Sequence, residues 1–263
     1  EGKRVIATIA PSYIGAFEIK KGEQIVSALK KLGFSYVEET AIGADIVSTL
    51  YKEEIDKGNH RNIITTACPS ANYLIEKYFP SLTKYMLPIV SPMIAHGKIL
   101  KYVYGMDSFV VFIGPCISKK VEANEGQHDD IIDAVLTFEE LDEWLKSSNI
   151  DLSKMDILPF DERSTERGRA FPLDGGVLKG FIKDYIKEKY DVKSIDGVEE
   201  CIDILNTLEN EDIEGLCIEL NACRDGCVNG PGMPKNNMSK YRRAKRVKDY
   251  IKSKDRNFTF EAV

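Results

Sequence analysis

Apolar and polar positions along the chain follow two different periods, which predicts alternating strands and helices. Mostly apolar runs of strand length occur at 4–10, 34–39, 62–67, 108–114, 134–138 and 215–220. Apolar residues spaced three and four apart occur at 22–32, 43–55, 70–80, 91–105, 139–148 and 176–190. The alternation of these two patterns predicts an α/β fold with largely parallel sheets.

Boundary signals divide this pattern into two lobes. Gly33 is expected to stop the helix at 22–32, and Thr137 is well placed as the N-cap of the helix at 139–148. A weakly marked boundary near 104–108 predicts lobes at about 1–105 and 106–235. A basic C-terminal helix is expected at about 236–256, with "NFTFEAV" after it as the start of a linker.

Composition indicates an ordinary globular protein. The 263 residues are 43% hydrophobic and 30% charged, and the net charge of −6 argues against a dedicated nucleic-acid binder. Positive charge gathers at 240–256, which predicts a solvated helix or a docking surface for an acidic partner. The absence of long apolar runs and of a secretory signal leads us to expect a cytoplasmic protein without a membrane span. The chain opens without Met, so we expect a fragment of a longer multidomain protein.

Four of the six cysteines follow predicted strands. Cys68 comes after 62–67, Cys116 after 108–114, and Cys223 and Cys227 after 215–220. Ligands of open α/β sheets bind beyond the carboxyl ends of strands, so these thiols are expected to converge. A starting helix would place Cys223 and Cys227 on one face.

Four converging thiols suit a 4Fe–4S cluster or zinc. Zinc sites usually use two close pairs, whereas Cys68 and Cys116 are solitary, which favours a cluster between lobes. Simple burial of the four thiols is the alternative. Cys201 and Cys217 lie inside a predicted helix and strand and are expected to pack in the core.

The three cysteine segments together resemble the signature motifs of one family. "TACPS" (66–70), "GPCISKKVEA" (114–123) and "CRDGCVNGPG" (223–232) are similar to those of the iron-iron (FeFe) hydrogenase catalytic domain. The likeness runs from about residue 4 to residue 252. It implies a single H-cluster domain over 1–263, built as two lobes that each hold a mostly parallel four-stranded sheet flanked by helices. The cluster would occupy the cleft between them.

The resemblance also implies the cofactor and its ligands. The H-cluster is a 4Fe–4S cubane joined through a cysteine sulfur to a two-iron subsite with CO, cyanide and a dithiolate amine. By motif, Cys68, Cys116 and Cys223 would bind the cubane, and Cys227 would bind it and bridge to the two irons.

Other motif positions would surround the two-iron subsite. Lys119 matches a lysine that donates to cyanide, which suits an ammonium with three donors. Ser12 is either a donor to the second cyanide or a helix N-cap. Ala10, Pro11 and Met93 match the pocket walls, and Glu122 either pairs with a basic group of its motif or lies on a helix surface.

Several positions depart from the family pattern. Active members carry a proton-relaying cysteine where this chain has Ala67. Tyr51 and Leu87 stand where the relay usually has a glutamate and a serine, and Glu54 alone survives from that path. Gly114 and Asn221 replace two methionines near the cluster, which alters the polarity there.

These departures resemble the sensory branch of the family, so we expect an H2 or redox sensor with weak hydrogen oxidation and evolution. The alternatives are a low-activity hydrogenase with another proton route, and a 4Fe–4S scaffold or redox protein without the two-iron site. Expected partners are H2 and protons, hydrogenase maturation proteins, and an electron-donor or signalling domain on the same chain or a partner. No nucleic acid is expected.

Overall fold

Two parallel sheets form the framework of the computed structural model, which describes residues 2, 4–58, 60–162 and 164–252. The first sheet has the order β2-β1-β4-β5 and the second the order β3-β7-β6. The strands are β1 (Val5–Ile9), β2 (Tyr36–Glu39), β3 (Ile63–Ile64), β4 (Phe109–Gly114), β5 (Ala134–Thr137), β6 (Asp191–Asp196) and β7 (Leu216–Asn221). All paired strands are parallel, which confirms the predicted fold class.

Helices connect the strands and cover both sheets. The α-helices are α1 (Tyr13–Ala16), α2 (Gln24–Lys31), α3 (Ala41–Lys57), α4 (Pro69–Tyr78), α5 (Pro92–Tyr104), α6 (Ser118–Glu122), α7 (Phe138–Ser147), α8 (Glu166–Arg169), α9 (Gly176–Phe181), α10 (Asp184–Lys189), α11 (Val198–Asn210) and α12 (Lys240–Lys252). Short 3-10 turns are η1 (Pro80–Tyr85), η2 (Gly126–His128), η3 (Leu152–Lys154) and η4 (Cys227–Asn229). Thr137 caps α7 in a capping box with Glu140, as its position predicted.

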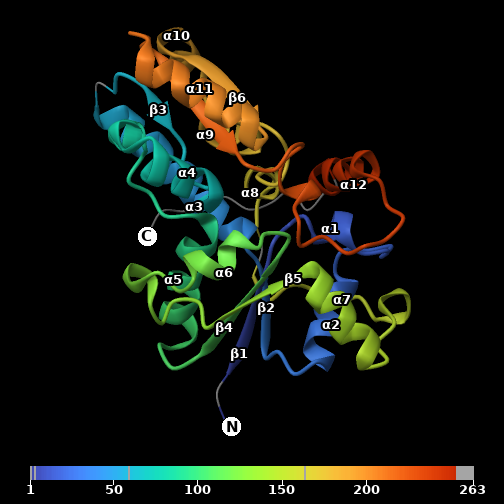
Figure 1. Ribbon diagram of the computed structural model, residues 1–263. Coiled ribbons are helices and arrows are strands. Elements are labelled where there is room, and N and C mark those ends of the chain that lie inside the picture. Colours follow the sequence, from blue (N-terminus) through green and yellow to red (C-terminus); the bar gives the residue numbers. More distant parts are fainter. Residues whose placement is uncertain (1, 3, 59, 163, 253–263) are drawn as a thin grey trace.

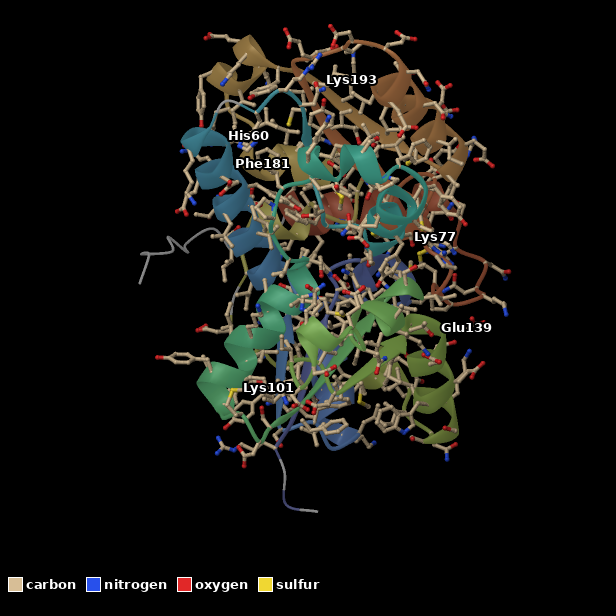
Figure 2. All side chains as sticks on the ribbon, turned by 60° about the vertical axis from the view of Figure 1, so that its left-hand side comes forward. His60, Lys77, Lys101, Glu139, Phe181 and Lys193 are labelled. Atoms are coloured by element: carbon tan, nitrogen blue, oxygen red, sulfur yellow. The ribbon has the colours of Figure 1, made fainter. Side chains whose placement is uncertain are left out.

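Each sheet forms its own half of the molecule. Figure 1 shows β1, β2, β4 and β5 in one half, β3 and β6 in the other, and α6 and α8 near the junction. Figure 2 shows Lys101 and Glu139 in the first half and His60, Phe181 and Lys193 in the second. The chain crosses between the halves more than once, because each sheet takes strands from both sides of residue 105. The sheets therefore do not correspond to the ranges 1–105 and 106–235.

The second sheet has three strands rather than the expected four. Beside β3, the segment around Met86 runs parallel but makes only an isolated bridge to Ile64, with Leu87 N–H donating to Ile64 O at 3.0 Å. Pro88 follows directly and has no N–H to extend the ladder. This edge is therefore a single bridge, not a strand.

Two further elements differ from the sequence pattern. Strand β6 was missed because it is a polar edge strand that pairs only with β7 and has no fully buried residue. The single helix expected at 176–190 is broken at Ile182, whose backbone is extended. The break lets both Phe181 and Ile186 enter one core, which their spacing of five would prevent on a continuous helix.

The central strand β7 separates two apolar cores. Cys217 packs with Phe181 on one side, whereas Leu216, Ile218 and Leu220 pack with Cys201 on the other. This alternation follows the period of two of a strand. The prediction that Cys201 and Cys217 pack in the core is confirmed.

Helix α12 holds α1 in place. Arg246 donates to the carbonyl oxygens of Ile14 and Ile19, both at 2.6 Å, and the hydroxyl of Tyr13 donates to that of Tyr250 at 3.1 Å. The basic helix is therefore only partly the solvated element that its charge predicted. Its expected last residues, 253–256, and the expected linker lie outside the described residues.

A buried ion pair secures this contact. Arg169 of α8 bonds the carboxylate of Glu39 at 2.8 Å and stacks over the ring of Tyr250, which itself donates to Glu39 at 2.9 Å. Glu39 and Arg169 are both buried, so each needs the other as a counter-charge.

Within the described residues, no helix combines the length and apolar character needed to cross a bilayer. This agrees with the expectation of no membrane-spanning helix.

We expect Arg169→Ala to lower the free energy of unfolding by about 3–5 kcal/mol, because it leaves the Glu39 carboxylate buried without a counter-charge. Urea unfolding measures the loss. Arg224→Ala is the matched control, because Arg224 is exposed and its pair with Glu199 spans 3.5 Å in solvent. Equal losses in the two variants would contradict a special role for the buried pair.

Candidate functional site

Three strands end at the junction between the halves, and each delivers a cysteine there. Cys68 follows β3 as the N-cap residue of α4. Cys116 follows β4 and precedes α6, and Cys223 follows β7. Because the strands are parallel within their sheets, their carboxyl ends present the thiols toward the junction.

Cys227 is reached through a turn rather than along a helix. Asp225 and Gly226 have φ of 66° and 78°, and Gly226 N–H donates to Cys223 O at 3.2 Å. The expectation that Cys223 and Cys227 lie on one helical face is therefore wrong. A side chain at Gly226 would also place Cβ 2.7 Å from Pro172 O, so only glycine fits.

Close backbone contacts join the second and third cysteine segments. Gly232 N–H donates to Pro115 O at 2.8 Å, and a Cβ at Gly230 would lie 2.7 Å from the same oxygen. The glycines of the third motif thus let its backbone approach that of the second. This contact fixes Cys227 relative to Cys116.

All four cysteines line one cavity at the junction. Its empty space is about 870 Å³, a figure that includes the part open to solvent. Among the described residues, no three His, Cys, Asp or Glu side chains are placed to hold a single metal ion. A cubane does not need such a group, because each thiolate binds a different iron, so this arrangement favours a cluster over zinc.

The thiols are perturbed by burial and by one another. Burial raises the pKa of Cys223 to about 11, with smaller contributions from Cys68 and Cys116. Burial also raises the pKa of Cys116 and Cys227, whereas the Lys119 ammonium lowers both. The raised pKa favours neutral thiols at Cys116, Cys223 and Cys227 at neutral pH, and binding iron must release their protons.

Lys119 lies at the cavity wall with a buried partner. Its Nζ is 2.7 Å from the Glu122 carboxylate and 3.5 Å from Ala67 O. Glu122 is buried, so the pairing alternative for Glu122 holds and the surface alternative does not. Lys120, by contrast, pairs with Glu140 at the surface.

Ser12 presents an unsatisfied hydroxyl at the same cavity. It precedes α1 but makes no capping hydrogen bond through its side chain. Its Oγ is buried without a partner among the described residues, although buried hydroxyls are normally paired. The N-cap alternative is therefore not supported, and the hydroxyl is available to a bound group.

The other residues expected in the cavity wall also line the cavity, except Gly114. Ala10, Pro11, Met93, Ala67 and Asn221 line it.

Gly114 does not line the cavity. A Cβ there would lie 2.6 Å from the ring of Phe112, which fills the space where the family methionine would project. Phe112 itself lines the cavity.

Apart from Ala67, which lines the cavity, the positions of the family proton relay are disconnected from it. Tyr51 is fully buried and its hydroxyl accepts from Thr66 N–H at 2.8 Å. Thr66 in turn donates to Ile89 O at 2.6 Å, and a main-chain carbonyl cannot pass a proton onward. Glu54 pairs with Lys57 on the outside of α3 at 3.2 Å, and Leu87 is core.

Some cavity residues were not singled out from the sequence. Gly168, Phe171, Pro172 and Val177 come from the segment around α8 and α9, and Thr40 begins α3. The first four lie in or beside "GRAFPLDGG", a family-like segment to which no role was attached. Thr40 carried no signal of its own.

This set of residues fits an H-cluster. Four thiols are present for iron, and Lys119 and the unpartnered Ser12 hydroxyl supply donors beside them. The ligand and donor roles themselves remain predictions.

Solved hydrogenase structures share this fold. The chain superposes on an [FeFe]-hydrogenase HydA1 from Chlamydomonas reinhardtii with a TM-score of 0.72 at 18% identity, covering 93% of this chain and 84% of that one. A structure described as stepwise H-cluster assembly in HydA matches with a TM-score of 0.70 over the same shares, also at 18% identity.

Comparison of sequences with curated proteins points to the same family. Iron hydrogenase 1 of Clostridium pasteurianum is 28% identical over 88% of this chain and 50% of its own length. The periplasmic [Fe] hydrogenase large subunit of Nitratidesulfovibrio vulgaris is 26% identical over 80% of this chain and 62% of its own. The cytosolic Fe-S cluster assembly factor NAR1 of Yarrowia lipolytica is 25% identical over 55% of this chain and 33% of its own. The chain thus spans about a third to three fifths of these relatives.

A family model for the C-terminal domain of the iron-only hydrogenase large subunit matches residues 3–231, which contain all four cavity cysteines. The chain therefore belongs to the family formed by the C-terminal domains of iron-only hydrogenase large subunits.

Proposed function

We propose that this domain binds an H-cluster and acts as a sensor of H2 or redox state, with only weak hydrogen oxidation and evolution. The observation that carries the proposal is Ala67, which lines the cavity where active members keep a proton-carrying thiol. Relays of this kind contribute about 10²–10⁴-fold to a rate, so their loss slows turnover without preventing H2 from binding.

The chain's own residues have distinct tasks in this proposal. When bound, the H-cluster supplies the irons at which H2 reacts and the cubane that takes up electrons. Cys68, Cys116, Cys223 and Cys227 hold it. Lys119, paired with Glu122, and the Ser12 hydroxyl orient it by donating hydrogen bonds.

Asn221 changes the polarity beside these cysteines. Its Nδ2 donates to Glu219 at 2.7 Å, and Glu219 also accepts from Leu178 N–H at 3.0 Å. A methionine at this position would make no such bond. The pair places a polar, titratable group one residue layer behind the cavity wall, which supports a shifted cluster potential.

A cubane-only scaffold is the competing class, since assembly factors are among the relatives. The buried Lys119 ammonium and the unpartnered Ser12 hydroxyl argue against it, because a cubane bound by four thiolates carries no cyanide to which these two donors could bond. Activity, partners and output belong to the proposal, as does any electron donor or signalling domain.

Infrared spectroscopy after loading with the two-iron precursor tests the assignment. We expect CO and cyanide bands in the wild type. Lys119→Met should shift or remove them while the cubane absorbance remains, because the donor to cyanide is lost. Lys120→Met, a neighbour at the surface, should leave the bands unchanged. A wild-type protein that holds a cubane but shows no CO or cyanide bands would establish the scaffold class instead.

Restoring the relay thiol tests the sensor proposal. We expect Ala67→Cys to raise H2 evolution with a strong reductant by about 10- to 100-fold in the loaded protein. Ala67→Ser is the matched control, since a hydroxyl is a far weaker acid than a thiol and should give a smaller gain. Wild-type rates typical of active members would refute the sensor proposal. An unchanged rate in Ala67→Cys would mean that Gly114, Asn221, Tyr51 or Leu87 limits H2 evolution instead.

Glu219 gives the protein a pH-dependent stability. Burial raises its pKa from 4.5 to about 7, partly opposed by the bonds from Leu178 and Asn221. Between these two values the unfolded chain binds fewer protons than the native protein. The free energy of unfolding therefore falls as pH rises through this window, by up to about 1.4 kcal/mol per pH unit.

Urea unfolding between pH 4.5 and 7 measures this slope. Glu219→Gln should remove the contribution of Glu219 to this slope. Glu200→Gln, at an exposed position on α11, should leave the slope unchanged. The same slope in Glu219→Gln as in the wild type would show that Glu219 titrates normally.

A further inference from the structure

A continuous chain of hydrogen bonds leads from the cavity into the first half of the molecule. Thr40 lines the cavity, and its hydroxyl is 2.7 Å from that of Thr8. Thr8 Oγ1 is 2.9 Å from His96 Nδ1, and His96 Nε2 is 3.0 Å from Glu38 Oε2. Tyr104 donates to the other oxygen, Glu38 Oε1, at 2.6 Å. Each step is a direct hydrogen bond between side chains that can both donate and accept a proton.

The chain is sealed from solvent until its outer end. Thr8 and His96 are 0% exposed, Glu38 is 3% exposed and Thr40 is 4% exposed. Tyr104 is only partly buried. A buried carboxylate is stable only with a partner, so Glu38 and His96 either form an ion pair or share the proton as a neutral pair.

The backbone is arranged to make these contacts. A Cβ at Gly43 would lie 2.2 Å from Pro92 O and 2.8 Å from His96 Cβ, so α3 and α5 touch at this glycine. Their contact presses the ring of His96 against β1 and β2. Thr40 is the N-cap residue of α3 but makes no capping hydrogen bond through its side chain. The hydroxyl is bonded to Thr8 instead of capping the helix.

We propose that Thr40, Thr8, His96, Glu38 and Tyr104 form a proton route between the cavity and the surface, in place of the relay that is absent at Ala67. The proposal rests on the proposed H2 chemistry of the cavity. It differs from the path through Tyr51, which ends on main-chain carbonyls.

Protons balance along this route. In one state Glu38 is ionised, His96 carries its proton on Nε2, and Nδ1 accepts from Thr8, which accepts from Thr40. A proton delivered to Thr40 Oγ1 moves the hydroxyl protons of Thr40 and Thr8 one step each, and Nδ1 becomes protonated. His96 then passes its Nε2 proton to Glu38, which is left neutral. Rotation of the Glu38 carboxyl group brings its proton to Tyr104, where it exchanges outward. Return of the His96 ring proton from Nδ1 to Nε2 by tautomerisation, with rotation of the two hydroxyls, then restores the first state.

Tyr104 stays protonated in this scheme. Burial and the nearby Glu38 carboxylate raise its pKa, so it acts as a hydroxyl that receives and donates, not as a phenolate.

The first test measures proton exchange without the two-iron subsite. The chain has only three histidines, so the ring N–H of His96 can be followed by nitrogen-15 NMR in the cluster-free protein. The double variant Thr8→Val with Tyr104→Phe breaks the route on both sides of His96 with little change in shape. We expect solvent exchange of the ring proton to slow by about tenfold or more.

A purely structural role gives the opposite result. Loss of two buried hydrogen bonds would then promote opening and leave exchange unchanged or faster. Thr65→Val with Tyr190→Phe is the matched control, because both residues are buried in the other half of the molecule. Exchange in Thr8→Val/Tyr104→Phe that is as fast as in the wild type would overturn the proposal.

The second test uses the loaded protein. Thr8→Val should lower H2 turnover by about tenfold or more, with unchanged CO and cyanide bands. Unchanged turnover would show that the route does not serve the cavity and would overturn the proposal. Loaded wild type with no H2 turnover would refute the weak catalysis in the proposed function, whereas the exchange experiment still decides separately whether the route conducts protons.

Discussion

The backbone contact between Pro115 and the glycines at 230 and 232 is the constraint on which the cavity depends. Pro115 follows a strand of the first sheet, and the glycines follow a strand of the second. Their contact sets how far apart the two sets of strand ends stand. Any side chain at either glycine would push the halves apart and separate the thiols that have to meet across the junction.

Around this fixed centre, the residues proposed to hold a cluster line the cavity, whereas Tyr51, Glu54 and Leu87 form no path to it. The cysteines, Lys119 and Ser12 surround the cavity, while Ala67 offers no proton and Tyr51 is bonded into the core. Other polar groups form hydrogen bonds close to the cavity. Asn221 is paired with Glu219, and Thr40 opens onto a chain that ends at Tyr104. Two sets of side-chain hydrogen bonds therefore organise the polar groups nearest to the proposed iron ligands.

Much of this could be predicted from the sequence, because strand ends and cysteines are local features. The apolar runs before Cys68, Cys116 and Cys223 indicated which thiols would share an edge. Sheet membership could not be predicted in the same way, since β3 pairs with β7 across about 150 residues and two isoleucines carry no pairing signal. The series of hydrogen-bonded side chains through His96 could not be predicted from the sequence for the same reason. Its members come from β1, β2, α3 and α5, and each taken alone is an ordinary buried polar residue.

The space shared by Gly114 and Phe112 has a consequence for how such a domain evolves. The ring of Phe112 occupies the volume that a side chain at Gly114 would need, and the ring is itself held in the core. A single mutation back to methionine therefore creates a clash before it restores any contact with the cluster. Reversion requires Phe112 to shrink first, a change that would open a void in the core while Gly114 remains. The two positions are therefore epistatic, because a methionine at Gly114 fits only together with a smaller side chain at Phe112.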